Sequence, residues 1–226
     1  MKILIACEES QTVCVEMRKL GHEAYSADIQ EPSGGHPEWH ILGNVLPLIN
    51  GFCSFTTMDG MYHEIPGKWD LLIAHPPCTY LSAAGACNLV RYGKLNHERF
   101  QNGLLAKDFF LQFYYANCDH ICIVNPAPLK VFNLPKYTQI IEPYYFGDPW
   151  KKRTCLWLIG LPPLEKTNPV EPLGCWVETS GRACRTKLRG AKGARSAKDR
   201  SKTFPGIAKA MAEQWAGEAK ENRADS

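Results

Sequence analysis

Short, unbroken runs of apolar residues recur along the chain, at 1–7, 69–74, 120–124 and 154–159. A continuous apolar run of this length is typical of a strand that is buried on both faces, as in a parallel sheet. Two further strands are expected at 22–27, which leads into Asp28, and at 137–142. These runs constrain the fold more than any other feature of the sequence.

Segments with helical character alternate with these strands. Residues 10–20 place Val13, Met17 and Leu20 at helical spacing, with Ser10 as the expected N-cap. Residues 97–117 and 204–219 are expected to form longer helices, and 43–45 to open a short one. Strands that alternate with helices predict an α/β fold, namely a mostly parallel sheet covered by helices on both faces.

The chain has 226 residues, which is enough for one domain with a substantial core. We expect residues 1–160 to form a catalytic and cofactor-binding α/β domain. A segment rich in proline, glycine and basic residues, 161–202, interrupts the pattern and is interpreted as a small basic insertion that resembles a target-recognition region. Residues 203–226 are expected to return to the main domain as a C-terminal helix.

Positive charge is concentrated in one part of this insertion. Residues 182–202 contain nine lysines or arginines and a single acid, Asp199, although the net charge of the whole chain is only +3. A basic segment on an otherwise acidic chain favours contact with a polyanion such as DNA. A solvated surface loop is the alternative that charge alone leaves open.

Cysteine usage and the lack of targeting signals favour the cytoplasm. The chain has ten cysteines and no Cys-x-x-Cys pair, so most are expected to be free thiols, and no metal site is expected. No apolar run approaches the roughly 18 residues of a membrane span, and the N-terminus lacks the features of a secretory signal. We therefore expect a cytoplasmic protein with no membrane partner.

Candidate functional residues follow three of the expected strands. Ligands bind parallel α/β sheets beyond the carboxyl ends of their strands. Asp28 lies there and has the position of an acid that accepts hydrogen bonds from a ribose. Two prolines, Pro76 and Pro77, follow another strand and would hold Cys78 in a fixed orientation. A thiol held in this way is a candidate nucleophile, the alternative being an inert cysteine in a turn.

The sequence around Cys78 resembles the Pro-Cys motif of the DNA cytosine-5 methyltransferases, particularly the compact forms of phages and prophages. The motif follows a buried strand in that family, as HPPCTYLS does at 75–82. The first turn, CEESQ at 7–11, is similar to the family's first motif, with Gln11 where a glycine is common. KKRTCLW at 151–157 resembles the family's Arg-containing strand, and RSKTFPGIA at 200–208 resembles its final motif.

This resemblance implies a fold of the S-adenosylmethionine-dependent methyltransferase type. It also implies a reaction in which a thiolate attacks carbon 6 of a cytosine flipped out of duplex DNA, so that carbon 5 accepts a methyl group. Cys78 would be the nucleophile, and Asn125 and Arg153 would line the base pocket. The residues implied for binding S-adenosylmethionine are Cys7, Glu8, Ser10, Asp28, Asn44, Pro77 and Thr203. A phage-encoded enzyme of this kind would act in the bacterial host cell.

One position departs from the family. The family supplies its catalytic acid from a Glu-Asn dipeptide at a strand end, whereas this chain has Val124 before Asn125. General acid catalysis typically contributes about 10²–10⁴-fold, so this change predicts an impaired enzyme unless another group substitutes. His75, Glu142 and Asp148 are the candidates for that role.

Two alternatives follow from these departures. Val124 favours a non-catalytic relative that only binds DNA or cofactor. The short region 161–202 favours a methyltransferase that acts on a free pyrimidine nucleotide. The sequence leaves the target site and the oligomeric state open.

Overall fold

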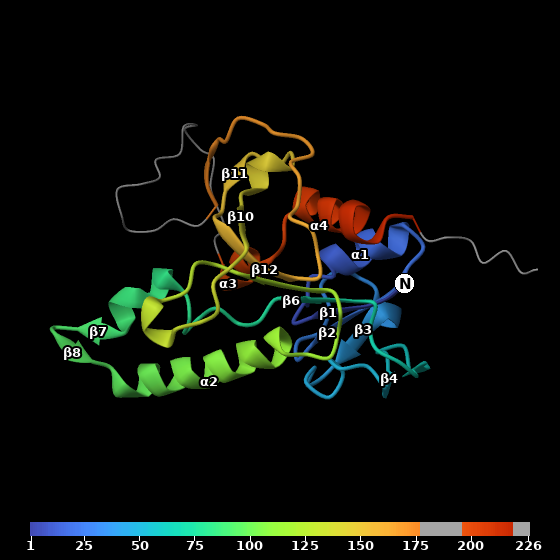
Figure 1. Cartoon of the computed structure of the whole chain (residues 1–226), viewed down its shortest axis with the longest axis horizontal. Coiled ribbons are helices and arrows are strands. Elements are labelled where there is room, and N and C mark those ends of the chain that lie inside the picture. Colours follow the sequence, from blue (N-terminus) through green and yellow to red (C-terminus); the bar gives the residue numbers. More distant parts are fainter. Residues whose placement is uncertain (177–195, 219–226) are drawn as a thin grey trace, which may run out of the picture.

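A seven-stranded mixed sheet forms the centre of the computed structural model, which describes residues 1–176 and 196–218. Figure 1 shows this sheet with helices packed against it. The spatial order of its strands is β10-β12-β9-β6-β1-β2-β3. Their bounds are β1 (Lys2–Ala6), β2 (Glu23–Asp28), β3 (His40–Leu42), β6 (Leu71–Ala74), β9 (Ile121–Asn125), β10 (Gln139–Ile141) and β12 (Thr154–Ile159).

Five neighbouring strands, β3, β2, β1, β6 and β9, run parallel to one another. The remaining strand pairs are antiparallel, because β12 runs against both β9 and β10. The chain builds outward from β1 to β2 and β3, then crosses back to place β6 on the other side of β1. This reversal of strand order makes the β1–β6 junction a topological switch point, where parallel sheets commonly bind ligands. The prediction of a mostly parallel α/β sheet is confirmed.

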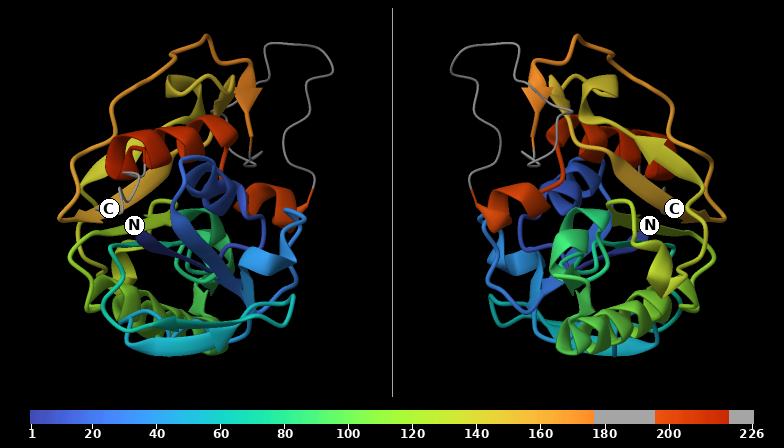
Figure 2. Two further views of the ribbon diagram at one scale, coloured as in Figure 1. Left: turned by 90° about the vertical axis from the view of Figure 1, so that its right-hand side faces the viewer. Right: turned by 90° about the vertical axis from the view of Figure 1, so that its left-hand side faces the viewer.

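Successive side chains of the central strands enter two separate hydrophobic clusters. Ile3 and Ile5 of β1 pack with α1 (Thr12–Lys19) and α4 (Pro205–Met211). Leu4 instead packs in the cluster that contains Phe110 and Phe113 of α2 (His97–Tyr114). Figure 2 shows α2, in green, and α4, in red, on different sides of the strands. This period of two is what a strand buried on both faces requires.

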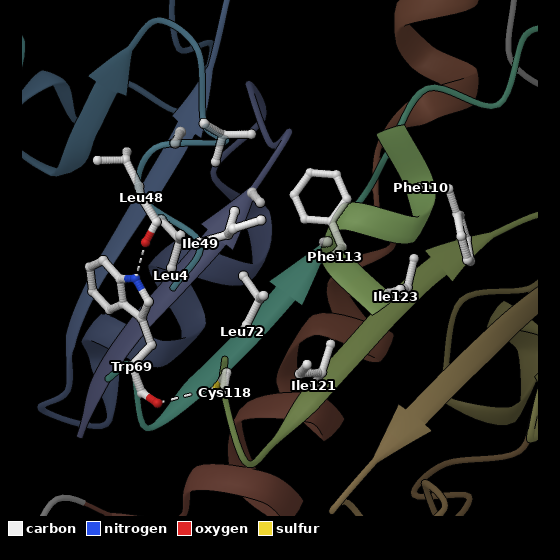
Figure 3. Close-up of a cluster of buried hydrophobic side chains, with 14 of the residues drawn as sticks. Leu4, Leu48, Ile49, Trp69, Leu72, Phe110, Phe113, Cys118, Ile121 and Ile123 are labelled. Carbon is white, nitrogen blue, oxygen red and sulfur yellow. Dashed lines mark hydrogen bonds between the residues drawn. The ribbon is translucent and has the colours of Figure 1, made fainter. Parts of the chain in front are cut away.

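The cluster that contains Phe110 and Phe113 also contains Trp69, whose hydrogen bond fixes the residues just before β6 (Figure 3). Trp69 is 2% exposed, and its indole Nε1 donates to the carbonyl of Leu48 at 2.6 Å. The Sγ atom of Cys118 donates to the carbonyl of Trp69 at 3.2 Å. A buried Trp needs such a partner for its N–H, and here the bond joins the loop before β4 to the strand that leads into the candidate site.

The segment between β3 and β6 differs from the prediction. Residues 43–45 bend and form no helix, and Gly43 has a φ of 151°. The chain then forms a hairpin from β4 (Cys53–Thr56) and β5 (Tyr62–Ile65), which the sequence analysis did not anticipate. A second hairpin, β7 (Val90–Arg91) and β8 (Lys94–Leu95), precedes α2.

The remaining elements are short. Four 3₁₀ turns and a π-helical turn connect or extend the main elements, at Pro37–Trp39, Ala83–Asn88, Lys130–Phe132, Pro143–Tyr145 and Ala212–Ala216. The expected closing helix thus divides into α4 and the π turn that extends it. Strand β11 (Trp150–Lys151) pairs in parallel with β13 (Gly174–Cys175), and α3 (Ala197–Ser201) precedes α4.

Part of the basic insertion lies outside the described residues, namely 177–195. Of the nine basic residues between 182 and 202, the described chain includes Lys198, Arg200 and Lys202. None of the helices within the described ranges has both the length and the apolar character needed to cross a bilayer.

Candidate active site at the carboxyl ends of the parallel strands

The candidate residues of four parallel strands lie at one edge of the sheet. Strands β1, β2, β6 and β9 are neighbours and run in the same direction. Asp28 and Asn125 are the last residues of β2 and β9, and Cys7 directly follows β1. Cys78 follows β6 by four residues. The fold therefore brings to one edge the groups that the sequence analysis selected from separate strands.

The loop that contains Cys78 is held at its start by backbone and side-chain hydrogen bonds. The amide of His75 donates to the carbonyl of Ala6 at 2.9 Å. The buried Asn125 donates from Nδ2 to the carbonyl of Pro76 at 2.8 Å. The Cys78 carbonyl accepts from the amide of Ser82 at 2.9 Å, which closes a turn. Cys78 is an exposed residue of this constrained loop, although its thiol is partly desolvated.

Two cations act on the Cys78 thiol. Desolvation raises its pKa above the ordinary value, whereas its own backbone and the charges of Lys152 and Arg200 lower it. Lys152 is itself half-buried, and this burial lowers its pKa to about 8, while Cys78 acts in the opposite direction. A lysine with a pKa near 8 can both stabilise a neighbouring anion and donate a proton near neutral pH. The sequence analysis missed Lys152.

The ammonium of Lys152 is oriented by the chain that precedes α4. Its Nζ donates to the carbonyl of Lys202 at 2.8 Å and lies 5.7 Å from the ring centroid of Phe204. Its backbone amide donates to Oε2 of Glu142 at 2.7 Å. Because the segment before α4 holds the ammonium and Glu142 holds the backbone amide, Lys152 occupies a defined position.

His75, a candidate for the missing acid, is affected by the charge of the same lysine, Lys152. Burial, and then the charge of Lys152, lowers the pKa of His75 to about 4. Its Nε2 is buried and has no hydrogen-bond partner among the described residues. A histidine with such a pKa is neutral at pH 7, so it holds no proton to donate as an imidazolium.

The two carboxylates that were the other candidates have backbone partners. Glu142 accepts from the amide of Lys152, and Asp148 accepts from the amide of Gly206 at 2.9 Å. Burial raises the pKa of each of them. Val124 is half-buried and packs in the same cluster as α1 and α4. Among these groups, Lys152 is the one whose charge acts on Cys78.

Arg153, which the resemblance implies for the base pocket, has an exposed side chain. Its charge lowers the pKa of Glu142 and of Cys155. The structure therefore brings the lysine before it, and not Arg153, into electrostatic contact with Cys78. A role for Arg153 in the base pocket stays a prediction.

The carboxylate of Glu8 caps α1. Its two oxygens accept from the amides of Val13 at 2.7 Å and Cys14 at 3.2 Å. Burial raises the pKa of Glu8 to about 8, and these two hydrogen bonds oppose the increase. The expected N-cap, Ser10, does not cap the helix; its Oγ accepts from Oγ1 of Thr12 at 3.1 Å.

The residue at the start of α1 has a backbone conformation that glycine usually adopts. Gln11 has a φ of 57° and is fully buried. Its Nε2 donates to the carbonyl of His36 at 2.8 Å, and its Oε1 accepts from the amide of His36 at 3.1 Å. These bonds compensate for the unfavourable backbone geometry and fasten the loop after β2 to the first turn.

Glu9 is a further buried acid that the sequence analysis did not select. Its side chain is 8% exposed and lies 3.3 Å from Nζ of Lys198, measured from Oε2. Neither carboxylate oxygen has a hydrogen-bond partner of good geometry among the described residues. Glu9 therefore retains acceptor capacity in a poorly hydrated environment.

The acid at the end of β2 lies close to the first turn. The charge of Asp28 raises the pKa of Cys7, after the larger effect of burial, to about 12. Oδ1 of Asp28 accepts from the amide of Gln30 at 2.9 Å. Asn44 is exposed, and its Oδ1 accepts from the amide of Leu46 at 3.1 Å, as in an Asx turn. Asp28 and Cys7 are thus brought together.

Pro77 and Thr203, the remaining residues predicted to bind the cofactor, lie next to Cys78 and Lys202 in the sequence. Pro77 is exposed beside Cys78, and Thr203 is half-buried next to Lys202. The segment 196–204 contacts both halves of the site, through Lys198 at Glu9 and through the carbonyl of Lys202 at Lys152. The segment 196–204 thus lies against the strand-end loops, and its role in cofactor binding stays a prediction.

Comparison with known proteins leaves the family of the chain open, since no protein-family model matches it and the curated proteins give no match.

Proposed function

We propose that this protein is an S-adenosylmethionine-dependent methyltransferase that acts on carbon 5 of cytosine in DNA, through a covalent adduct with Cys78. The observation that carries the proposal is Cys78, an exposed residue on a constrained loop at the carboxyl edge of the sheet, which interacts electrostatically with Lys152. The strand order is compatible with the methyltransferase-type fold that the sequence resemblance implies.

The proposed chemistry begins at the thiol. The Cys78 thiolate adds to carbon 6 of cytosine, and the electron pair of the 5,6 double bond makes carbon 5 nucleophilic. Carbon 5 then forms a bond to the methyl carbon of the sulfonium donor, whose carbon–sulfur bond breaks. Water takes the proton from carbon 5, and expulsion of the thiolate restores the aromatic ring, so that cytosine and the sulfonium donor become 5-methylcytosine, a neutral thioether and one hydrated proton.

Lys152 takes the role that the family gives to the missing glutamate. Thiolate addition transfers negative charge to the pyrimidine ring, and a nearby donor stabilises that charge. The ammonium of Lys152 is held by the Lys202 carbonyl and has a pKa of about 8, so it is mostly protonated at pH 7. Val124 has no donor. Lys152 thereby supports an active enzyme over a non-catalytic relative.

The first two strand ends fit the methyl donor. Asp28 lies at the end of β2, where an acid can accept hydrogen bonds from a ribose. Glu9 has buried oxygens without hydrogen-bond partners among the described residues, and these suit the ammonium of the donor's amino-acid part. When bound, S-adenosylmethionine supplies an electrophilic methyl group. In Glu8, by contrast, both carboxylate oxygens already accept hydrogen bonds from backbone amides of α1.

DNA is proposed as the substrate because the segment 196–204, whose Arg200 acts electrostatically on Cys78, is basic. Lys198, Arg200 and Lys202 belong to the segment 196–204, and the charge of Arg200 acts on Cys78. Such groups bind phosphates, and binding through them weakens as salt increases. A cytoplasmic location, in a bacterial host if the gene belongs to a phage, completes the proposal.

The decisive experiment treats DNA with the full-length protein and S-adenosylmethionine, digests it to nucleosides and identifies any modified base by mass. We expect 5-methylcytosine with the parent protein and none with Cys78→Ala. Covalent trapping by 5-fluorocytosine DNA should require the same thiol. Methyl transfer that persists in Cys78→Ala would refute the mechanism.

Two other outcomes would favour the alternatives. Methylation of dCMP without methylation of DNA would identify an enzyme of free nucleotides. Val124 supports the second candidate function, a binding protein without activity. An inactive parent protein together with an active Val124→Glu variant would establish it.

A further inference from the structure

The segment that follows Cys78 is anchored to the first turn of α2 by one arginine. Arg99 donates from Nη2 to the carbonyl of Thr79 at 2.6 Å. Its guanidinium carbon lies 5.1 Å from the ring centroid of Tyr80. The backbone amide of Arg99 donates to Oδ1 of Asn96, the N-cap of α2, at 3.0 Å. The anchor therefore belongs to a capped helix of 18 residues.

This contact has a counterpart on the other side of the nucleophile. The carbonyl of Pro76, two residues before Cys78, accepts from Asn125 at 2.8 Å. The carbonyl of Thr79, one residue after Cys78, accepts from Arg99. Side chains from β9 and α2 thus hold the backbone on both sides of Cys78, which is itself an exposed residue.

From this arrangement, we infer that Arg99 is a positioning residue, which holds Cys78 in place through the Thr79 carbonyl. The inference rests on the proposed role of Cys78 as a nucleophile and adds a residue that neither the motif nor the resemblance indicates. Arg99 acts on the backbone next to the reacting atom.

The local packing is adapted to this arginine. A Cβ atom at Gly85 would lie 2.6 Å from Nη2 of Arg99 and 3.3 Å from the Thr79 carbonyl oxygen, so the glycine leaves room for the contact. The Nε atom of Arg99 is buried without a hydrogen-bond partner among the described residues. Burying an N–H in this way is unfavourable, and the charged hydrogen bond and the contact with Tyr80 offset the loss.

An arginine suits this role better than a lysine. Its planar guanidinium can donate to a carbonyl with one nitrogen while its face lies against an aromatic ring. A lysine ammonium is a flexible point charge, which can reach the carbonyl but fixes its direction less well. Arg99 also lines a cavity of about 280 Å³, formed with Tyr80 and Asn102, so the loop has space into which it could move once released.

The predicted consequence is kinetic. A displacement of about 1 Å at a reacting group can reduce a rate about 10²-fold. Release of the Thr79 carbonyl should therefore lower kcat for methyl transfer by roughly 10- to 100-fold. The KM for DNA and the affinity for the methyl donor should change little, since the inferred action of Arg99 is on the Thr79 carbonyl.

The test compares four variants of the full-length protein. Arg99→Leu removes the donor, and Arg99→Lys keeps the charge. Gly85→Ala introduces a methyl group that displaces the guanidinium end without changing Arg99. Lys94→Ala is the matched control, because it removes one exposed positive charge from the neighbouring hairpin. Gly85→Ala also keeps the test valid if Arg99→Leu fails to fold.

Two measurements decide the outcome. Hydrogen exchange at the amides of Leu81 and Ser82, which donate to the Cys78 carbonyl, reports on the loop. We expect faster exchange and lower kcat in Arg99→Leu and Gly85→Ala, partial recovery in Arg99→Lys, and parent behaviour in Lys94→Ala. Unchanged exchange would refute the anchor, and faster exchange with unchanged kcat would refute its positioning role.

The two proposals can fail separately. If the parent protein transfers no methyl group, the proposed function fails, and exchange at Leu81 and Ser82 still decides whether Arg99 holds the loop. If the parent protein is active and exchange is the same in all variants, the inference about Arg99 alone is wrong.

Discussion

Substitution of Lys152 by methionine should change how the stability of the protein depends on pH. Burial lowers the pKa of Lys152 from 10.5 to about 8. Between these two values the unfolded chain binds more protons at this position than the folded protein does, so stability rises with pH. A difference of this size corresponds to about 3 kcal/mol of stability that the parent protein gains between pH 7 and pH 10.5.

A methionine side chain does not titrate, so the Lys152→Met variant should lack this gain. The free energy of unfolding of Lys152→Met, relative to the parent, should therefore fall by about 3 kcal/mol from pH 7 to pH 10.5. For a domain of this size, that corresponds to a relative change in Tm of roughly 6–12 °C. Loss of the hydrogen bond to the Lys202 carbonyl lowers the free energy of unfolding by a similar amount at every pH, so it does not change the pH dependence.

The assay is urea unfolding at pH 7, 8, 9, 10 and 10.5, in a Cys78→Ser background that removes the coupled titration of the thiol. Other tyrosines and cysteines titrate in both proteins, and their effects cancel in the difference. Parallel stability curves would refute the reasoning, because they would mean that the Lys152 ammonium is hydrated in the folded protein and has an ordinary pKa.

Three further predictions concern acids of the site. Val124→Glu should raise methyl transfer at pH 7, by up to about 10²-fold if Lys152 is the weaker acid; equal rates in the parent and the variant would show that no acid is missing. Glu9→Gln should weaken binding of S-adenosylhomocysteine about 10-fold, as measured by calorimetry, because a charged acceptor is lost; an unchanged Kd would exclude Glu9 from the cofactor site. Burial raises the pKa of Glu8 to about 8, so the folded protein binds the extra proton and the parent protein should lose stability as pH rises from about 4.5 through 8. Glu8→Gln should flatten that loss in urea unfolding at pH 5 and pH 8, and an unflattened curve would contradict the assignment.

Continuous apolar runs made the main strands predictable. β1, β6 and β12 fall within the segments selected from sequence, and β9 extends one residue beyond its segment, because burial on both faces allows few polar residues. The apolar composition does not indicate the orientation of a strand in the sheet, since parallel and antiparallel buried strands have similar apolar runs. The reversed orientation of β12 was therefore not predictable from its composition.

Short elements that depend on polar contacts were also missed. β3 is three residues long and contains the buried His40, whose Nδ1 lies 2.8 Å from Oγ of Ser26 on β2. The capping of α1 by Glu8 involves a residue four positions before the helix. Neither contact has a periodic pattern in the sequence.

The orientation of β12 also explains why Lys152 escaped the sequence analysis. Parallel strands bring the residues that follow them to the ligand-binding edge, and this rule selected Asp28, Cys78 and Asn125. An antiparallel strand brings the residues that precede it. Cys155 pairs with Asn125 at the end of β9, so the chain just before β12 lies at the same edge. Lys152 reaches Cys78 for this reason, and in an entirely parallel sheet it would lie at the opposite edge.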